Sequence, residues 1–345
     1  MSHPNPWRGD WAVLNMKSNA EVASLTADVN LSDFQEAQRY VAEHAYRTPL
    51  LTSRLLSALT DFDVRVKAEM FQRTGSYKLR GPLNKFRHLT SHERQQGVVC
   101  SSAGNHAQGV ALAASIYKIR AAVVMATNAT PSKVEATRGY GAEVIQHGTI
   151  WDEANDKCQQ LAKERGLTVI HPFDDPQLMI GQGTLGLEIY EEFPEVEIVI
   201  VPIGGGGLIS GVSMALKACN PKICVIGVES SGAPGMRKSI DAGHVVTLEQ
   251  MNCTIDGLRV KRVGENTFKV VQRFVDDIVT LPDEDIFDAV LWIMAHCKLV
   301  AEGAAAAPVA ALMKGLVKAP SGSKVVCVLS GGNINLDQIK GLKWN

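Results

Sequence analysis

The sequence predicts an α/β protein with an open, mostly parallel sheet. From Gly97 onward, short runs rich in β-branched residues alternate with amphipathic segments of about a dozen residues. This alternation is typical of βαβ units. The chain has 345 residues, which corresponds to about two domains. The expected strands are GVVC, AAVVM, AEVI, LTVI, EIVIVP, ICVIGV and KVVCVL.

The first half of the chain begins with a polar leader that reaches about Asn30. We expect a helix in LSDFQEAQRYVAEHA, opened by a capping box of Ser32 and Gln35 and ended by the step Thr48–Pro49. A strand, VRVKAEM, should follow directly.

A further helix is expected after Thr130. This residue is a good N-cap, and Pro131 suits the first helical position. Gly139 and Gly141 should close the same helix. No repeat or low-complexity linker marks a domain boundary along the chain.

Composition and charge exclude several classes of function. Hydrophobic residues make up 46% and charged residues 21%, as in ordinary globular proteins. A formal charge of -1 gives no broad attraction for nucleic acid or an anionic membrane, so the expected partner is a small molecule. The seven cysteines form no C-x-x-C pair, which favours reduced thiols in a cytoplasmic protein without a zinc site.

Targeting signals are not evident either. The start, MSHPNPWRGDW, has no basic region followed by an apolar core. No apolar run reaches the roughly 18 residues that a membrane span needs. Secretion and membrane insertion are therefore not expected.

The strongest local signal is the run of four glycines from Gly204 to Gly207, between a strand and a helix. Backbone N–H groups of such a turn can surround a phosphate at the start of the helix. No Lys-Ser/Thr pair follows, which excludes a Walker loop. Glu229 ends the next strand, where a ribose-binding acid would lie, yet Ile209 and Ser210 occupy the places for the third glycine of a dinucleotide fingerprint.

Two other turns carry polar groups at strand ends. KVVCVLSGGNINL places Ser330 at the carboxyl edge of a strand, where open α/β sheets bind their ligands. VVCSSAGNHAQGVALAA offers a nest that suits a carboxylate. The groups of that nest are Ser101, Ser102, the amides around Ala103 and Gly104, Asn105 and His106.

Lys78, in FQRTGSYKLRGPLNKF, is the candidate reactive group. Taken alone, a lysine is usually a solvated surface charge, and each glycine-rich turn can be a simple packing device. The combination changes this interpretation. A cofactor with a phosphate and an aldehyde, acting on an amino acid, needs a phosphate cradle, a carboxylate nest, a polar partner and a lysine together. Pyridoxal 5'-phosphate (PLP) is such a cofactor.

Six collinear blocks between about Thr48 and Asp337 resemble the serine/threonine dehydratases and serine racemases of PLP fold type II, a fold like that of the tryptophan synthase beta chain. The resemblance implies two open, twisted, mostly parallel sheets flanked by helices. It also implies a large domain of residues 1–90 and 168–345 and a small mobile domain of residues 91–167, whose closure excludes water. The blocks are TGSYKLRGPLNKF, SSAGNHAQGVA, TPSKVEATRGYGAEV, HPFDDPQLMIGQGT, VPIGGGGLISGV and LSGGNINL.

The same resemblance implies a role for each candidate residue. Lys78 would form the internal Schiff base and Tyr77 would lie against the cofactor face. Glu302, in LVAEGAAAAP, resembles a glutamate near the cofactor, with a helix N-terminal acid as the alternative. The remaining roles are Asn105 for the pyridine hydroxyl, Gly204, Gly205, Gly206, Gly207 and the Leu208 amide for the phosphate, Ser330 for the ring nitrogen, and Ser102, Ala103, Gly104 and His106 for the substrate carboxylate.

The expected reaction is α,β-elimination from a 3-hydroxy amino acid, L-threonine or L-serine, which gives a 2-oxo acid and ammonia. A hydroxyl facing the ring nitrogen makes a weaker electron sink than a carboxylate, which favours elimination over transamination. Lys78 would remove the Cα proton, for which its pKa of about 10.4 must be lowered.

Ala103 favours a dehydratase over a racemase. Similar racemases carry a second serine here that protonates the opposite face, and a methyl group has no proton to give. Slow racemisation through water stays open.

Pro82 and Tyr77 depart from the alanine and phenylalanine that are usual in this family. Cation-binding relatives use two acids six residues apart. Here Glu229 occupies the first of these positions but Gly235 occupies the second, so no metal is expected.

Several alternatives stay open. They are an amino-acid racemase, a dehydratase of threo-3-hydroxyaspartate or phenylserine, a nicotinamide-dependent oxidoreductase at the Gly204 turn, and a non-catalytic PLP or amino-acid binding protein. Because the sequence stops at Asn345, we expect a short catabolic enzyme without a C-terminal regulatory domain. The resemblance also implies a homodimer or homotetramer.

Overall fold

The computed structural model describes residues 29–342. The polar leader expected before Asn30 therefore lies, up to residue 28, outside the described residues. In residues 29–342, no helix is both long and apolar enough to cross a membrane.

The larger of the two sheets in the described part of the chain has six strands in the order β1-β2-β10-β7-β8-β9. All neighbours in it run parallel except β1 and β2, which are antiparallel. The sequence did not predict β1 and β9. The strands are β1 (Leu50–Thr52), β2 (Asp63–Ala68), β7 (Ile198–Pro202), β8 (Cys224–Ser230), β9 (Asp277–Leu281) and β10 (Lys324–Leu329).

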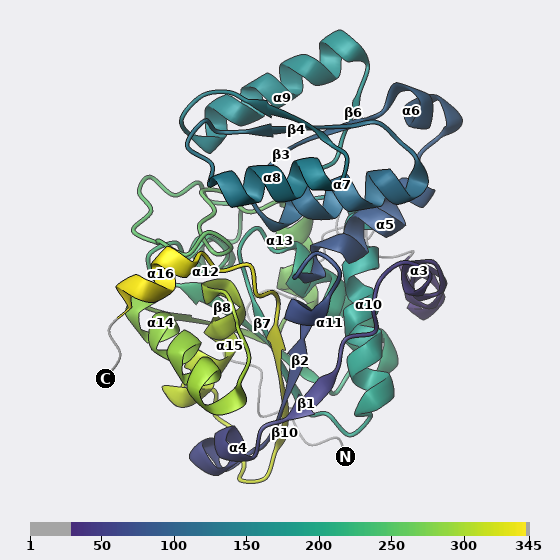
Figure 1. Ribbon diagram of the computed structural model, residues 1–345. Helices are drawn as coiled ribbons and strands as arrows, with labels where there is room; N and C mark the ends of the chain where they lie inside the picture. Colours follow the sequence, from purple (N-terminus) through teal and green to yellow (C-terminus); the bar gives the residue numbers. More distant parts are fainter. Residues whose placement is uncertain (1–28, 343–345) are drawn as a thin grey trace.

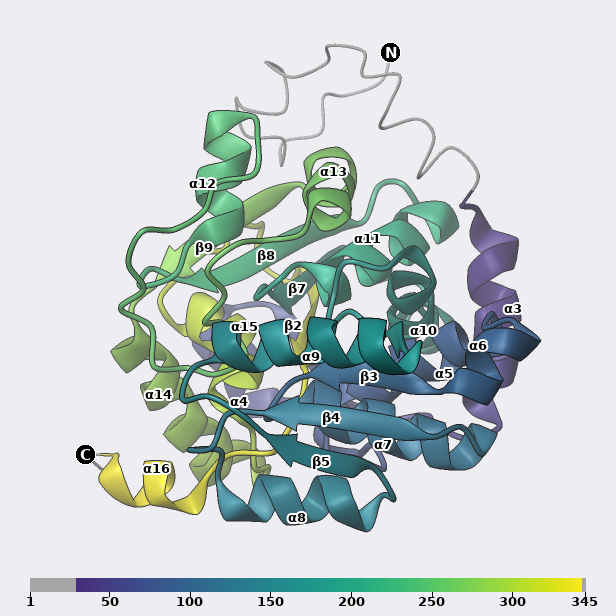
Figure 2. The same cartoon turned by 90° about the horizontal axis from the view of Figure 1, so that it is seen from above.

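The smaller sheet has four parallel strands in the order β5-β4-β3-β6. Figure 2 shows β3, β4 and β5 side by side. All seven predicted runs are strands, and the predicted fold class of mostly parallel sheets flanked by helices is confirmed. The strands are β3 (Val98–Ser101), β4 (Ala121–Met125), β5 (Glu143–Gln146) and β6 (Thr168–Val169).

Helices cover both faces of the larger sheet. Buried side chains of α14 and α15 form one core against it, and those of α10, α11 and α13 form another on the opposite face. The two layers lie on either side of the sheet in Figure 1. The helices of this part are α3 (Leu31–Ala42), α4 (Arg54–Thr60), α5 (Arg80–Arg87), α10 (Pro176–Glu192), α11 (Gly207–Cys219), α12 (Gly235–Ala242), α13 (Glu265–Phe274), α14 (Asp283–Trp292), α15 (Gly303–Met313) and α16 (Leu336–Gly341).

The smaller sheet and its helices α7, α8 and α9 are called the small lobe below. In Figure 1, α7 and α8 lie on the side of the small sheet that faces the larger sheet, and α9 lies on the other side. This arrangement places the start of α7 and of α8 above the larger sheet. The helices are α6 (Ser91–Gln96), α7 (Asn105–Tyr117), α8 (Pro131–Gly139) and α9 (Trp151–Arg165).

The first described helix differs from its prediction at both ends. The N-cap of α3 is Asn30, whose Oδ1 accepts a hydrogen bond from the Ser32 N–H at 2.9 Å. The Asn30 N–H in turn donates to Asp33 Oδ2 at 2.8 Å. The predicted Ser32/Gln35 box is therefore wrong, because Asn30 is an equally good cap two residues earlier. The helix ends at Ala42, well before the predicted Thr48–Pro49 stop.

Two further local predictions hold in part. Helix α8 begins with Pro131 at N1, but the Thr130 side chain makes no cap hydrogen bond. Gly139 is the last helical residue, and Gly141 has a positive φ of 94°, which a side chain would strain. The expected strand VRVKAEM ends at Ala68, where a 3-10 turn, η1 (Glu69–Phe71), begins.

Candidate active site

Lys78 lies in a short 3-10 helix, η2 (Tyr77–Leu79), at the carboxyl-terminal edge of the larger sheet. The Tyr77 N–H donates to the carbonyl of Ser330, the residue after β10, at 3.0 Å. On the other side, a Cβ at Gly109 of α7 would collide with the Lys78 carbonyl oxygen. The backbone of Lys78 is therefore held between the end of β10 and the small lobe.

The amine of Lys78 points into a protected space. Its Nζ donates to the Pro172 carbonyl at 2.8 Å and lies 5.3 Å from the centre of the Tyr77 ring. Burial lowers the pKa of Lys78 to about 8, although the nearby Glu302 carboxylate acts to raise it. A lysine with this pKa can lose its proton far more easily than one in water.

Asn105 joins the small lobe to the larger sheet through a chain of side-chain amides. Its Nδ2 donates to Glu302 Oε1 at 2.7 Å, and its Oδ1 accepts from Asn333 Nδ2 at 2.7 Å. Asn333 also donates to the Thr74 carbonyl at 2.8 Å. The acceptor and donor of Asn105 are thus both fixed, which orients its side chain beside Lys78.

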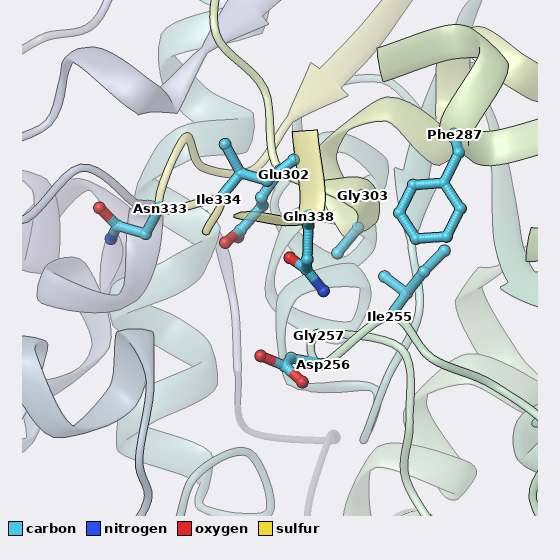
Figure 3. A pocket seen from close by; sticks show the side chains of 10 residues that line it. Ile255, Asp256, Gly257, Phe287, Glu302, Gly303, Asn333, Ile334 and Gln338 are labelled. Atoms are coloured by element: carbon cyan, nitrogen blue, oxygen red, sulfur yellow. The ribbon is translucent and has the colours of Figure 1, made fainter. Parts of the chain in front are cut away.

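Glu302 has the geometry of an N-cap before α15, but its side chain makes no cap hydrogen bond. Its carboxylate instead contacts Asn105. Burial raises the pKa of Glu302 to about 7, and the Asn105 hydrogen bond opposes that rise. The group lines a cavity of about 20 Å³ together with Asp256, Gly257 and Asn333 (Figure 3). Glu302 thus lies beside Asn105 and within electrostatic reach of Lys78, and with this pKa it can hold or release a proton near neutral pH.

The glycine run forms a turn with no room for side chains. A Cβ on Gly205 would overlap the Phe173 ring. Gly206 has φ of +94°, and a Cβ there would come within 2.7 Å of Met236 Cε. These contacts and the backbone conformation explain why residues 204–207 are glycines.

The run also opens toward a helix start. Leu208 is in the first turn of α11, whose N–H groups have no partner within the helix. Thr267 Oγ1 donates to the Gly205 carbonyl at 2.8 Å and holds the turn from behind. A Cβ on Gly204 would strike the Gly257 carbonyl. The arrangement, called the cradle below, leaves room for a phosphate group beside the free N–H groups of the α11 start.

The turn between β3 and α7 carries the predicted carboxylate nest. The Gly104 N–H donates to Ser102 Oγ at 3.2 Å, and the methyl of Ala103 lies between them in the chain. The imidazole of His106 is buried, and its Nε2 donates to the Ile170 carbonyl at 3.0 Å. Burial lowers the pKa of His106 to about 3, so the ring is neutral and only the backbone N–H of this residue is suited to bind an anion.

The segment between β6 and α10 and the turn with Asn333 belong to two of the family-like blocks, but the sequence predicted no role for Pro172, Phe173 or Asn333. Pro172 accepts from Lys78, and Phe173 covers the glycine cradle. Asp174 Oδ1 accepts from the Thr267 N–H at 3.0 Å and so fixes the residue that supports the cradle. The signals were present, since HPFDDP follows a strand and Asn333 lies in the same turn as Ser330.

Glu229 takes no part in this site. It is buried at the end of β8 and accepts from the N–H groups of Met236 and Arg237, each at 2.8 Å. Burial raises its pKa to about 8 against those two hydrogen bonds. The carboxyl group therefore caps the start of α12. Within residues 29–342, no group of three or more His, Cys, Asp or Glu side chains is arranged to hold a metal ion.

Residues 41–331 match the family described as pyridoxal-phosphate dependent enzyme. The chain belongs to this family. The match extends from α3 to the turn after β10, so it includes Lys78, the cradle and Ser330. The cofactor of the protein is therefore PLP, as the sequence predicted, and the predicted family resemblance is confirmed.

Named relatives are similar over most of the chain. An L-threonine ammonia-lyase from Thermotoga maritima is 47% identical over 312 residues, which are 90% of this chain and 77% of that protein. A catabolic L-threonine dehydratase from Staphylococcus aureus is 42% identical over 95% of both chains. The solved structure of maize serine racemase has a TM-score of 0.87 and 36% identity, and covers 91% of this chain and 96% of that one.

The residues present fit PLP. Because its residues are glycines, the cradle is free of the Cβ atoms that would collide with its neighbours. It opens at the start of α11. Lys78 follows Tyr77, whose backbone N–H is hydrogen-bonded to the carbonyl of Ser330 at the end of β10. The Asn105 amide is already aimed by Glu302 and Asn333. A phosphate, a lysine-linked carbon and a ring each have a suitable partner.

Proposed function

We propose that the protein is a PLP-dependent L-threonine ammonia-lyase, which converts the amino acid to 2-oxobutanoate and ammonia. The observation that carries the proposal is the pairing of the buried Lys78 amine, whose pKa is about 8, with the methyl of Ala103 in the carboxylate turn. One group can take a proton from Cα, and the other cannot return one. The two threonine-cleaving relatives support the same reaction.

We propose the following positions for the cofactor and substrate. Lys78 binds the cofactor covalently, and Tyr77 lies against the ring. Ser330 faces the ring nitrogen, Asn105 contacts the ring hydroxyl, and Glu302 orients Asn105. The groups proposed to hold anions are Gly204, Gly205, Gly206, Gly207 and the Leu208 amide for the phosphate, and Ser102, Ala103, Gly104 and the His106 amide for the substrate carboxylate.

The reaction follows from what these residues do to protons. PLP, when bound, withdraws electrons from the substrate Cα. The neutral form of Lys78 accepts the Cα proton, and its low pKa makes that form accessible near neutral pH. The carboxylate turn holds the substrate so that the Cα–H bond faces Lys78. Glu302 keeps the Asn105 amide in one orientation throughout.

We also propose the domain division expected from the family, with residues 91–167 as a small mobile domain and residues 1–90 and 168–345 as the large one. The composition of the two sheets supports this division in outline, because β3 to β5 lie within the small range and every strand of the larger sheet lies outside it. The fourth strand of the smaller sheet, β6 (Thr168–Val169), begins one residue beyond the proposed boundary. Movement of the small lobe would open and close the space around Lys78 and exclude water during the reaction.

The remaining expectations concern the surroundings of the protein. We propose that it works in the cytoplasm as a homodimer or homotetramer, with no nucleic-acid or membrane partner. The formal charge of -1 supports the absence of nucleic-acid and membrane partners, and the cysteines without C-x-x-C spacing support the cytoplasm. The oligomeric state is the expectation that comes from the family resemblance. Light scattering coupled to size-exclusion chromatography measures the oligomeric state directly.

A substrate panel tests the proposed reaction. The PLP-loaded enzyme is incubated with L-threonine, L-serine, threo-3-hydroxyaspartate and phenylserine, and 2-oxo acid, ammonia and the enantiomer of recovered substrate are measured. Among the four substrates we expect L-threonine to be converted fastest, with 2-oxobutanoate as the product. Lys78→Ala should abolish the reaction. Racemised serine without 2-oxo acid would instead support the second candidate, a serine racemase, which the similarity to the maize enzyme favours.

A further inference from the structure

One ion pair crosses from the small lobe to the larger part of the protein. Lys133, the third residue of α8, places its Nζ 2.9 Å from Oδ2 of Asp256. Asp256 lies in the connection between α12 and α13, outside the small lobe. Among ion pairs of the described residues, this is the one that joins residues 91–167 to the rest of the chain.

The turn that carries Asp256 is rigid and belongs to the wall of the site. The N–H groups of Leu258 and Arg259 both donate to the Ile255 carbonyl at 3.0 Å. A Cβ on Gly257 would come within 2.7 Å of Ala304 Cβ, so the turn is packed against the start of α15.

The same turn touches the phosphate cradle. The Gly257 carbonyl is the atom that a Cβ on Gly204 would strike. Asp256 and Gly257 line the cavity beside Glu302, as Figure 3 shows. An ion pair to Asp256 therefore connects α8 to a fixed point next to both the cradle and the Glu302 carboxylate.

We propose that Lys133 and Asp256 are a positioning pair that holds the small lobe closed over the bound amino acid. This inference rests on the proposed function in so far as closure serves the lyase reaction. Asp256 is 77% exposed, so the pair remains hydrated and weak. An exposed pair shifts an equilibrium by up to about fivefold, which favours closure without preventing the lobe from opening to release product.

The pair is tested by exchanging its charges. Lys133→Glu and Asp256→Lys each place like charges side by side, and the double variant restores the attraction in reverse. For each single variant we expect the KM for L-threonine to rise about three- to tenfold, with kcat within about twofold of the parent, because neither residue touches the reacting atoms. In the double variant the KM should return to within about twofold of the parent value.

A matched control comes from the same helix. Glu135 and Arg138 form an exposed pair at 2.7 Å within α8 that does not cross to the other lobe. Glu135→Lys and Arg138→Glu should leave the KM unchanged. The proposal is overturned if the single variants of Lys133 and Asp256 behave like this control, or if the double variant is as impaired as the two single effects combined.

A second measurement does not depend on turnover. In the PLP-loaded enzyme without substrate, hydrogen exchange of the α8 amides and of residues 255–259 should speed up in each single variant and recover in the double variant. If exchange follows the charges but no protein releases 2-oxobutanoate, the lyase proposal fails and the pair stands. If threonine is cleaved while exchange and KM ignore the charges, the pair fails and the lyase proposal stands.

Discussion

The surroundings of Lys78 make its amine lose a proton more readily than that of an ordinary lysine. The amine is taken out of water between the small lobe and the end of β10, and Pro172 offers it one carbonyl. Desolvation of the cationic form outweighs the attraction of Glu302, so the pKa falls. The chemistry proposed for the site depends on this balance.

The balance predicts the pH dependence of the reaction. Lys78 accepts a proton only when it is neutral, and a group with a pKa of about 8 becomes neutral as the pH rises through that value. We expect kcat for L-threonine to increase from about pH 6 to pH 9 and then level off. Circular dichroism at each pH confirms that the protein stays folded. A kcat that is constant over this range would contradict the assignment of Lys78 as the base.

The glycine cradle gives a second prediction at the residue scale. Gly206→Ala forces a Cβ into a left-handed conformation and toward Met236, which costs about 1–2 kcal/mol. Spent on deforming the cradle, this cost should weaken PLP binding about tenfold, as measured by absorbance titration of the apoenzyme.

The control for that variant is Gly139→Ala at the end of α8. An added Cβ there meets no atom within 4 Å. PLP affinity should be unchanged, and the stability of the helix should increase by about 0.5–1 kcal/mol. Equal PLP affinity in both variants would mean that the Gly206 turn does not bind the cofactor.

At the scale of elements, a buried charge cluster ties the Lys78 segment to the larger sheet and its helices. Arg80, the first residue of α5, makes bidentate hydrogen bonds to Glu69 in η1 and to Glu188 in α10. Lys67 of β2 lies 2.7 Å from Glu188. Burial alone would lower the pKa of Arg80, but the two carboxylates raise it above its ordinary value. Four elements, α5, η1, α10 and β2, thus meet in one buried cluster of charges.

Removal of this guanidinium should be costly. Arg80→Met leaves Glu69 and Glu188 buried without their main partner, and we expect the free energy of unfolding in urea to fall by about 3–5 kcal/mol. Arg138→Met removes an exposed arginine of α8 and should change it by at most about 0.5 kcal/mol. A loss below about 1 kcal/mol for Arg80→Met would show that the cluster does not stabilise these elements.

Elements with a strong periodic signal were predictable from the sequence, and those defined by tertiary contacts were not. Five of the seven predicted strands, β3, β4, β7, β8 and β10, are apolar runs that are almost entirely buried, whereas β5 and the two-residue β6 are only partly buried. Strand β1 has three residues and exists because it pairs with β2, and β9 (Asp277–Leu281) begins with a charged residue at a sheet edge. The cap of α3 was misplaced because Asn30 and Ser32 are both good caps, and only the backbone decides between them.

The candidate site shows the same division. Lys78, the glycine run and Ser330 were predictable because, taken together, they supply the groups that PLP needs, although each alone has an ordinary structural explanation. The importance of Asn333 depends on its contact with Asn105, 228 positions away, and no local pattern encodes that contact. The neutral state of His106 likewise follows from burial, which the motif alone does not reveal.

At the scale of the whole molecule, the two lobes enclose the site, so substrate should change their relative mobility. Lys78→Ala lets substrate bind without turnover. With L-threonine added to the PLP-loaded variant, we expect slower hydrogen exchange at residues 102–106 and in α7, and no change in β10, which is already central in its sheet. Equal exchange with and without L-threonine would contradict closure of the small lobe on the amino acid.

The late position of β10 in the chain has a consequence for biosynthesis. This strand lies between β2 and β7 and pairs with both, whereas β3 to β6 are consecutive. During synthesis on the ribosome, the smaller sheet can therefore form early. The edges of β2 and β7 that pair with β10 stay unpaired until residue 329 has left the ribosome. Unpaired strand edges favour aggregation, so we expect the nascent chain to be prone to aggregation until β10 has been synthesised. A premature stop codon before Lys324 should yield an insoluble fragment and no miniature enzyme.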